Sequence, residues 1–154
     1  MVETKDVKGF VFAASSWTCV LSIIAFIFFA LSYQTGYVSI VYGEKNSIVI
    51  TIEAILILML TSITTIFQIT GKVDKREFYD VAMYVLVPLL TTATLLLLVD
   101  RVDAIGNCIV APWDAGHGGE ESCYLSFVAM GCWFVADIIN IIGCFIGYKE
   151  KRSQ

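Results

Sequence analysis

The sequence contains few of the residues and motifs on which enzymes depend. It has one histidine (His117) and two prolines in 154 residues, and charged residues make up only 16% of the chain. It lacks the C-x-x-C, H-E-x-x-H, G-x-S-x-G and P-loop motifs. The single histidine lies outside the apolar stretches, which excludes a histidine-based catalytic pair within a membrane. We therefore expect a non-enzymatic protein with no catalytic residues and no cofactor.

The acidic residues near the histidine do not suggest a metal site. His117 could be grouped with Asp114, Glu120 and Glu121, but their spacing matches no known ligand pattern. We expect no metal, and we expect no nucleic-acid partner for a chain of net charge −4.

What the sequence does contain is four long apolar stretches, and 58% of all residues are hydrophobic. Each stretch is as long as the roughly 20 residues that a helix needs to cross a bilayer. Backbone groups find no water there, so they must pair within the segment, as in a helix. The sequence predicts an all-α membrane protein, a four-transmembrane-helix bundle forming a single domain over 1–154. The predicted spans are 9–33, 47–69, 79–99 and 124–148.

Basic residues are distributed unevenly between the connections. Eight of the ten Lys and Arg residues lie near the two termini or in the connection 70–78, and only Lys45 and Arg101 lie in the other two loops. Cytoplasmic segments of membrane proteins carry such an excess. We expect cytoplasmic N- and C-termini, a cytoplasmic loop at 70–78, and outer loops at 34–46 and 100–123.

The second outer loop contains two of the five cysteines, Cys108 and Cys123. A disulfide between them would stabilise the fold by about 3 kcal/mol through loop closure, and the alternative is two unpaired thiols. The enclosed segment carries Trp113 and acidic residues, and a closed acidic loop of this kind is typical of a recognition surface. Trp113 could equally lie flat at the membrane interface, and both interpretations remain open. The candidate partner-binding residues of this loop are Trp113, Asp114, Glu120 and Glu121.

The candidate intramembrane polar residues are Glu53 in the second predicted span and Asp137 and Asn140 in the fourth. Counted from the outer span ends, Glu53 lies about 9 Å deep and Asp137 about 20 Å deep. Intramembrane acids either mark a proton or cation pathway or hold helices together in hydrogen-bonded, protonated form. The difference in depth of about 10 Å, and the lack of a basic residue or histidine in the predicted spans, favour the second role.

Small residues form the remaining pattern. Gly143 and Gly147 make a G-x-x-x-G motif, and Ser15, Thr18, Ser22 and Ala25 share one face of the first predicted helix. Such residues allow helices to approach closely, within a bundle or between copies.

The chain resembles the MARVEL-domain tetraspan proteins. The resemblance rests on four spans, cytoplasmic ends, a short first outer loop, and a second outer loop holding the pair Cys108 and Cys123. Claudin-type tetraspans are less similar, because the loop 34–46 contains neither Cys nor Trp. The resemblance implies a non-catalytic role in membrane apposition, junctions or vesicle trafficking.

We therefore expect a tetraspan scaffold or adaptor that organises membrane contacts or partner proteins through its helix faces and its outer loop. Its expected partners are the lipid bilayer and other integral membrane proteins or further copies of itself. We expect it in the plasma membrane or at a cell junction rather than in an internal vesicle membrane. The alternative is an accessory subunit of a channel or transporter, or a small conducting oligomer that uses Glu53 and Asp137.

Overall fold

The computed structural model describes residues 4–34, 45–70, 76–110 and 119–152 of the chain, with side chains over 9–33, 48–70, 81–102 and 121–146. The described residues form four helices: α1 (Thr4–Gln34), α3 (Lys45–Ile69), α4 (Arg76–Val110) and α5 (Gly119–Arg152). Each contains a stretch long and apolar enough to cross a membrane: Gly9–Tyr33, Ile48–Ile69, Val81–Val102 and Glu121–Ile146. The prediction of an all-helical fold with four helices of membrane-spanning length is confirmed.

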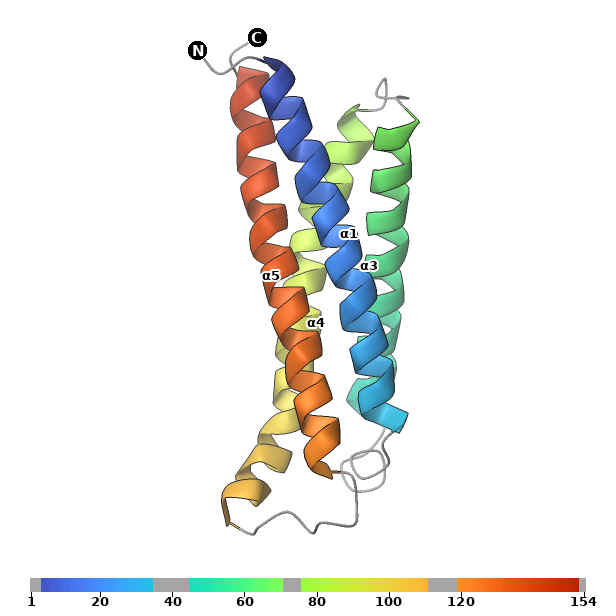
Figure 1. Ribbon diagram of the computed structural model, residues 1–154, viewed down its shortest axis with the longest axis vertical. Helices are drawn as coiled ribbons and strands as arrows, with labels where there is room; N and C mark the ends of the chain where they lie inside the picture. The colour runs from blue at the N-terminus through green and yellow to red at the C-terminus, as the bar shows by residue number, and fades with distance from the viewer. Residues whose placement is uncertain (1–3, 35–44, 71–75, 111–118, 153–154) are drawn as a thin grey trace.

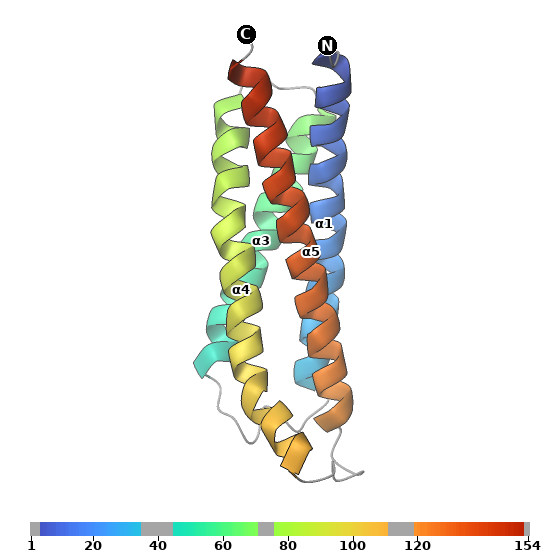
Figure 2. The same cartoon turned by 90° about the vertical axis from the view of Figure 1, so that its left-hand side faces the viewer.

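The four helices run alternately up and down in one elongated bundle (Figure 1). Around the bundle, α1 packs on α3 and α5, and α4 packs on the same two helices from the opposite side. The pair α1 and α5 forms the most extensive interface. The first turn of α1 and the last turn of α5 lie together at one end, which we call the terminal end (Figure 2). The opposite end is called the distal end.

The helices extend beyond the predicted spans. The interval assigned to the second outer loop, 100–123, is shorter in the structure, because α4 continues to Val110 and α5 begins at Gly119. The first proline after the apolar run is Pro112. Without a proline, the i→i−4 hydrogen bonds of α4 can continue past the last apolar residue. The apolar stretch therefore ends before the helix does, so the predicted span is shorter than α4.

The distribution of side chains differs from that of a soluble protein, because the interior contains polar as well as apolar groups and the surface is largely apolar. Buried polar side chains include Ser15, Thr18, Ser22, Thr61, Thr64, Arg101, Ser122, Ser126, Asp137 and Asn140. Large apolar side chains lie exposed on the outside of every helix, among them Trp17 at 60% and Phe145 at 72%. Exposed apolar area on this scale requires a cover other than water. The fold is thus compatible with a multi-pass integral membrane protein.

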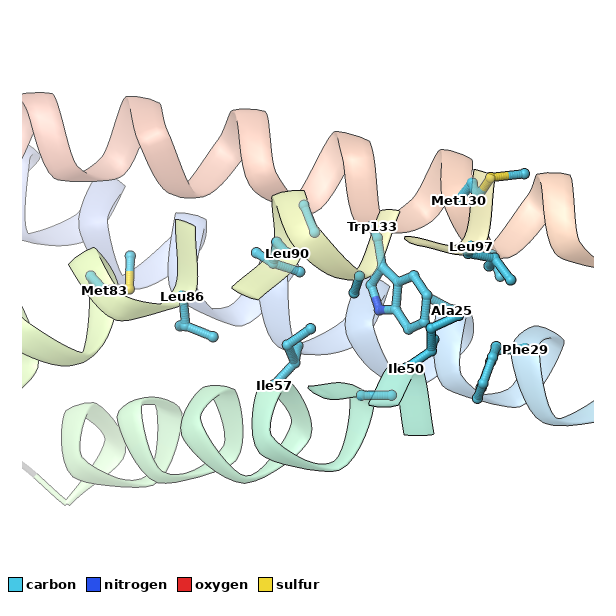
Figure 3. Packing of buried hydrophobic residues seen from close by; sticks show 14 residues of the cluster. Ala25, Phe29, Ile50, Ile57, Met83, Leu86, Leu90, Leu97, Met130 and Trp133 are labelled. Carbon is cyan, nitrogen blue, oxygen red and sulfur yellow. The ribbon is translucent and has the colours of Figure 1, made fainter. Parts of the chain in front are cut away.

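The centre of the bundle is filled by side chains from all four helices (Figure 3). Trp133 of α5 is fully buried, and its ring lies 5.7 Å from that of Phe29 on α1. Ile50 and Ile57 of α3 and Leu90 of α4 pack in the same cluster. Small residues complete it where helices approach closely: Ala25, Ala54, Ala93, Ala129 and Ala136.

Most hydroxyls in the helices are satisfied by their own helix. Thr18, Ser22 and Thr61 each donate to the backbone carbonyl four residues earlier, at 2.7–2.9 Å. Such bonds let a hydroxyl sit in an apolar environment without a partner on another helix. The hydroxyls that do contact another helix therefore stand out, and they define the candidate site.

Candidate functional site

Asp137 on α5 is one of the two acids that the sequence predicts to lie within the membrane, and it contacts Thr91 of α4. Its side chain is only 8% exposed, and the Thr91 hydroxyl oxygen lies within hydrogen-bonding distance of Oδ2, at 2.7 Å. Its other oxygen, Oδ1, is buried without a hydrogen-bond partner among the described residues. The acid predicted to lie within the membrane therefore bridges two helices.

The geometry around Thr91 indicates whether the Asp137 carboxyl group is protonated. The Thr91 oxygen lies 2.9 Å from the Val87 carbonyl oxygen and 2.7 Å from Asp137 Oδ2. One hydroxyl carries a single proton, so it cannot fully serve both acceptors. A protonated Asp137 satisfies both contacts, because the carboxyl then donates to Thr91 while Thr91 donates to Val87. Burial of a carboxylate with a single hydrogen bond would also be costly.

Glu53 on α3 reaches α4 from the other side. It is half-buried, its carboxyl group lies near the hydroxyl of Thr92, and its Oε2 is buried without a partner in the described part of the chain. Thr91 and Thr92 are consecutive, so the two acids lie at nearly the same level of the bundle. The predicted difference in depth of about 10 Å is wrong.

The reason for that error lies in the ragged distal end of the bundle. Depths were counted from the distal span ends, but α4 and α5 extend further there than α3 does (Figure 1). Glu53 and Thr92 are equally far along the chain from Ile69 and Arg76, the two helix ends at the α3–α4 connection. Counted from that end, the acid and its neighbour coincide.

We call Glu53, Thr91, Thr92 and Asp137 the polar belt. Thr91 and Thr92 are the two central residues of the 22-residue apolar stretch Val81–Val102. Both are exposed on the outside of α4, while Asp137 lies behind Thr91 and Glu53 flanks Thr92. The fold thus brings acids from two different helices to the middle of the apolar stretch of α4, where Asp137 is buried and Glu53 is half-buried.

Asn140 and Gly143 of α5 face the bundle interior towards the terminal end. The Asn140 amide donates to the Met83 carbonyl at 3.0 Å, and its Oδ1 is buried without a partner among the described residues. A Cβ placed on Gly143 would lie 3.3 Å from the Ala14 Cβ and 3.6 Å from the Met83 Cε. Gly143, predicted as a partner-binding residue, therefore permits close approach of α1, α4 and α5 within one chain.

A second polar cluster, which was not predicted from the sequence, lies at the distal end. Arg101 was assigned to an outer loop, but it is helical and 0% exposed. Its Nε donates to Ser126 at 2.8 Å and its Nη2 donates to Ser32 at 3.4 Å, while Nη1 has no partner in the described part of the chain. Ser122 of α5 donates to the backbone carbonyl of Ser32 at 2.6 Å. The cluster thereby joins α1, α4 and α5.

An aromatic series connects this cluster to the bundle centre. The Tyr33 ring lies 4.9 Å from Phe29, which contacts Trp133, and the Arg101 guanidinium lies 5.1 Å from the Tyr33 ring centroid. Tyr33 also donates to Asp100 Oδ2 at 3.0 Å. Two features of the sequence could have indicated this cluster. Ser122 and Ser126 are four residues apart and so share one face of a helix, and Arg101 lies at the end of an apolar run.

The remaining predicted residues are only partly described. Cys123 is buried and Glu121 is exposed. The helices include Cys108, Glu120 and Gly147, but the surroundings of these three residues lie outside what the structure describes. Trp113 and Asp114 lie outside the described residues altogether. The described side chains contain no disulfide, but Cys108 is not among them, so its pairing with Cys123 stays a prediction.

The described residues contain no group of three or more His, Cys, Asp or Glu side chains arranged to hold a metal ion. Comparisons with protein-family models, with curated proteins and with solved structures found no match to this chain.

Proposed function

We propose that this chain is a non-enzymatic tetraspan membrane adaptor that binds other integral membrane proteins through the outer faces of its helices. In this proposal the chain crosses the bilayer four times, with both termini in the cytosol. It acts in the plasma membrane or at a cell junction.

The observation that carries the proposal is the outward position of the polar belt. In a bilayer, polar side chains normally face the interior of a bundle or a water-filled cavity. Here Thr91 and Thr92 are exposed at the middle of a span, beside a half-exposed Glu53. The two hydroxyls are bonded to their own helix, but the Glu53 carboxyl beside them has an unpartnered oxygen among the described residues. A carboxyl group at that depth is unfavourable against lipid and favourable against a polar group of another polypeptide. An association surface explains why this carboxyl group is there.

The resemblance to MARVEL-domain tetraspans supports the same class of function, since it implies a non-catalytic role in membrane organisation. In this proposal the loop closed by Cys108 and Cys123, with Trp113, Asp114, Glu120 and Glu121, provides a second contact surface outside the membrane. Non-reducing peptide mapping tests that bridge directly, because an intact disulfide leaves the two cysteine-containing peptides joined.

The second candidate is a proton- or cation-conducting assembly, and one observation favours it. Glu53 and Asp137 lie at one level, which removes the objection that the two acids are too far apart to cooperate. Against conduction through a single copy, the interior between the belt and the distal cluster is filled by Trp133, Phe29 and Leu97. Conduction would therefore require a pathway between copies.

Reconstitution separates the two candidates. Purified protein in liposomes, with a pH-sensitive dye inside and an imposed proton gradient, should leak no faster than protein-free liposomes. The Glu53→Gln and Asp137→Asn variants should behave identically to the wild type. Proton or cation flux in the wild type that disappears in either variant would refute the adaptor proposal.

Photo-crosslinking in cells provides the positive test. A photoreactive amino acid at Leu95 of α4, which is 53% exposed, should yield a discrete adduct with another integral membrane protein. The same probe at Leu97, which is fully buried in the core, should give no intermolecular adduct and serves as the control. Adducts with lipid alone at Leu95, and at further exposed positions of the other three helices, would contradict an adaptor role.

A further inference from the structure

We propose that the polar belt binds a transmembrane helix of a different protein that carries a lysine or arginine at mid-membrane. This inference rests on the proposed adaptor function and specifies the chemistry of its partner.

The belt has more hydrogen-bond acceptors than donors. The Thr91 hydroxyl lies within bonding distance of the Val87 carbonyl, and Thr92 donates to the carbonyls of Pro88 and Leu89 at 2.7 and 3.1 Å. Their protons are thus already engaged within α4. A partner that binds here must supply donors.

The unsatisfied atoms of the belt are carboxyl oxygens. Glu53 Oε2 and Asp137 Oδ1 are both buried without a partner among the described residues, and the Asp137 side chain is more than nine-tenths buried. Lysine offers three donors and arginine five, and neither accepts a hydrogen bond. A basic side chain that reaches the carboxyl groups therefore complements the belt in hydrogen bonding, whereas a neutral amide would bring a further acceptor.

The position of the belt determines where the partner's charge must lie. Thr91 and Thr92 are central in a 22-residue span, so a basic residue of the partner must lie near the middle of its own apolar stretch. A charged side chain there is costly on its own and is normally paired. Each protein would thus satisfy a group that the other cannot satisfy alone.

A second copy of this chain cannot provide the basic group. Within the four candidate spans the only basic residue is Arg101, which is 0% exposed and already donates to Ser126. It lies nine residues from Thr92 along α4, about 14 Å along the helix axis. The occupant is therefore a different polypeptide.

The test uses defined peptides in place of an unknown partner. Fluorescently labelled protein is reconstituted in liposomes with an acceptor-labelled polyleucine helix of about 20 residues, carrying either a central lysine or a central leucine. Energy transfer measured against peptide-to-lipid ratio gives the affinity for each. We expect the lysine peptide to bind about tenfold more tightly than the leucine peptide.

Variants of the protein test whether the belt is responsible. Glu53→Gln should abolish the preference for lysine, and Thr92→Val should weaken binding of the lysine peptide about threefold. Thr94→Val is the matched control, because Thr94 makes the same kind of bond to its own backbone, at Leu90, but is half-buried where Thr92 is exposed. Thermal unfolding of each variant in detergent verifies that the bundle is intact.

Several results would overturn this inference. The first is equal binding of the two peptides, and the second is a preference for lysine that survives Glu53→Gln in a folded variant. The third is energy transfer between copies of the protein that is lost in Glu53→Gln, because that would indicate that a second copy occupies the belt. Equal binding leaves the adaptor function standing, because apolar faces can still dock. Ion flux in the reconstitution experiment would instead refute the adaptor function itself.

Discussion

At the scale of single residues, a few buried polar side chains join neighbouring helices. Asp137 contacts Thr91 of α4, and Asn140 bonds the Met83 carbonyl of the same helix. Arg101 contacts Ser126 of α5 and Ser32 of α1. In an apolar environment such bonds contribute modestly, about 0.6–2 kcal/mol each, but they fix which helix faces meet. Two substitutions test these contacts.

Asp137→Asn should leave the stability of the bundle nearly unchanged. The asparagine amide can donate to the Thr91 oxygen as a protonated aspartic acid does, and Thr91 can still donate to Val87. Asp137→Ala should lower the free energy of unfolding by about 1–2 kcal/mol, because it removes the bond between α4 and α5. Thermal unfolding in detergent measures both. A loss in Asp137→Asn as large as that in Asp137→Ala would mean that the carboxyl is ionised in the folded state.

Ser126→Ala should destabilise the distal cluster by about 1–3 kcal/mol, because the buried Nε of Arg101 then loses its hydrogen-bond acceptor. Ser62→Ala on α3 is the control, since Ser62 is only half-buried and remote from the cluster in sequence. Equilibrium unfolding of the two variants in mixed micelles makes the comparison. Equal stability of the two would show that water or lipid groups replace the serine at no cost.

At the scale of helices, the pairing of α1 with α5 depends on small residues at both ends of their interface. Gly143 lies against Ala14 towards the terminal end, and Ser122 bonds the Ser32 carbonyl at the distal end. These two contacts align the helices antiparallel and in register. Close approach at the glycine leaves no room for a larger side chain.

Gly143→Leu should therefore destabilise the bundle by about 1–3 kcal/mol or more through overpacking. Gly131 on the same helix is the matched control, because a Cβ there would meet nothing within 4 Å. Gly131→Leu should have no packing cost and should gain helix propensity of up to about 1 kcal/mol. Thermal unfolding of the pair gives the comparison. Equal effects at the two glycines would contradict the close contact of α5 with α1.

At the scale of the whole molecule, the protein has apolar side chains on its surface and a mixed polar and apolar interior. Trp17 and Trp133 illustrate the two environments, since one is 60% exposed and the other 0%. Placed in a bilayer, the first would contact acyl chains directly and the second would be shielded by protein. The two tryptophans can report separately on the membrane insertion proposed above.

Single-tryptophan variants should distinguish these environments. With the other two tryptophans replaced by phenylalanine, Trp17 should be quenched strongly by lipids with brominated acyl chains, and Trp133 only weakly. Steady-state fluorescence in reconstituted vesicles measures the quenching. Equal quenching of the two would contradict the bundle packing, and no quenching of Trp17 would contradict insertion into the bilayer.

The sequence alone determined the helical fold and the number of membrane-length helices, because that information is local. An apolar stretch of sufficient length specifies a helix whatever surrounds it. The acids were also found from sequence, since an ionisable residue within an apolar stretch is conspicuous wherever it points. Helix ends were predicted less well, because polar residues appear in the sequence before the helix ends. The extension of α4 to Val110 is an example.

Only the tertiary structure decided how residues from different helices meet. Glu53 and Asp137 are far apart in the sequence, and their depths counted from the span ends were unequal. Asp137 nevertheless contacts Thr91, and Glu53 lies near the adjacent Thr92. Arg101 was expected in a loop and is instead enclosed by α1, α4 and α5. Levels and faces across a bundle depend on helix offset and rotation, which arise from packing between helices. No single segment of sequence contains that information.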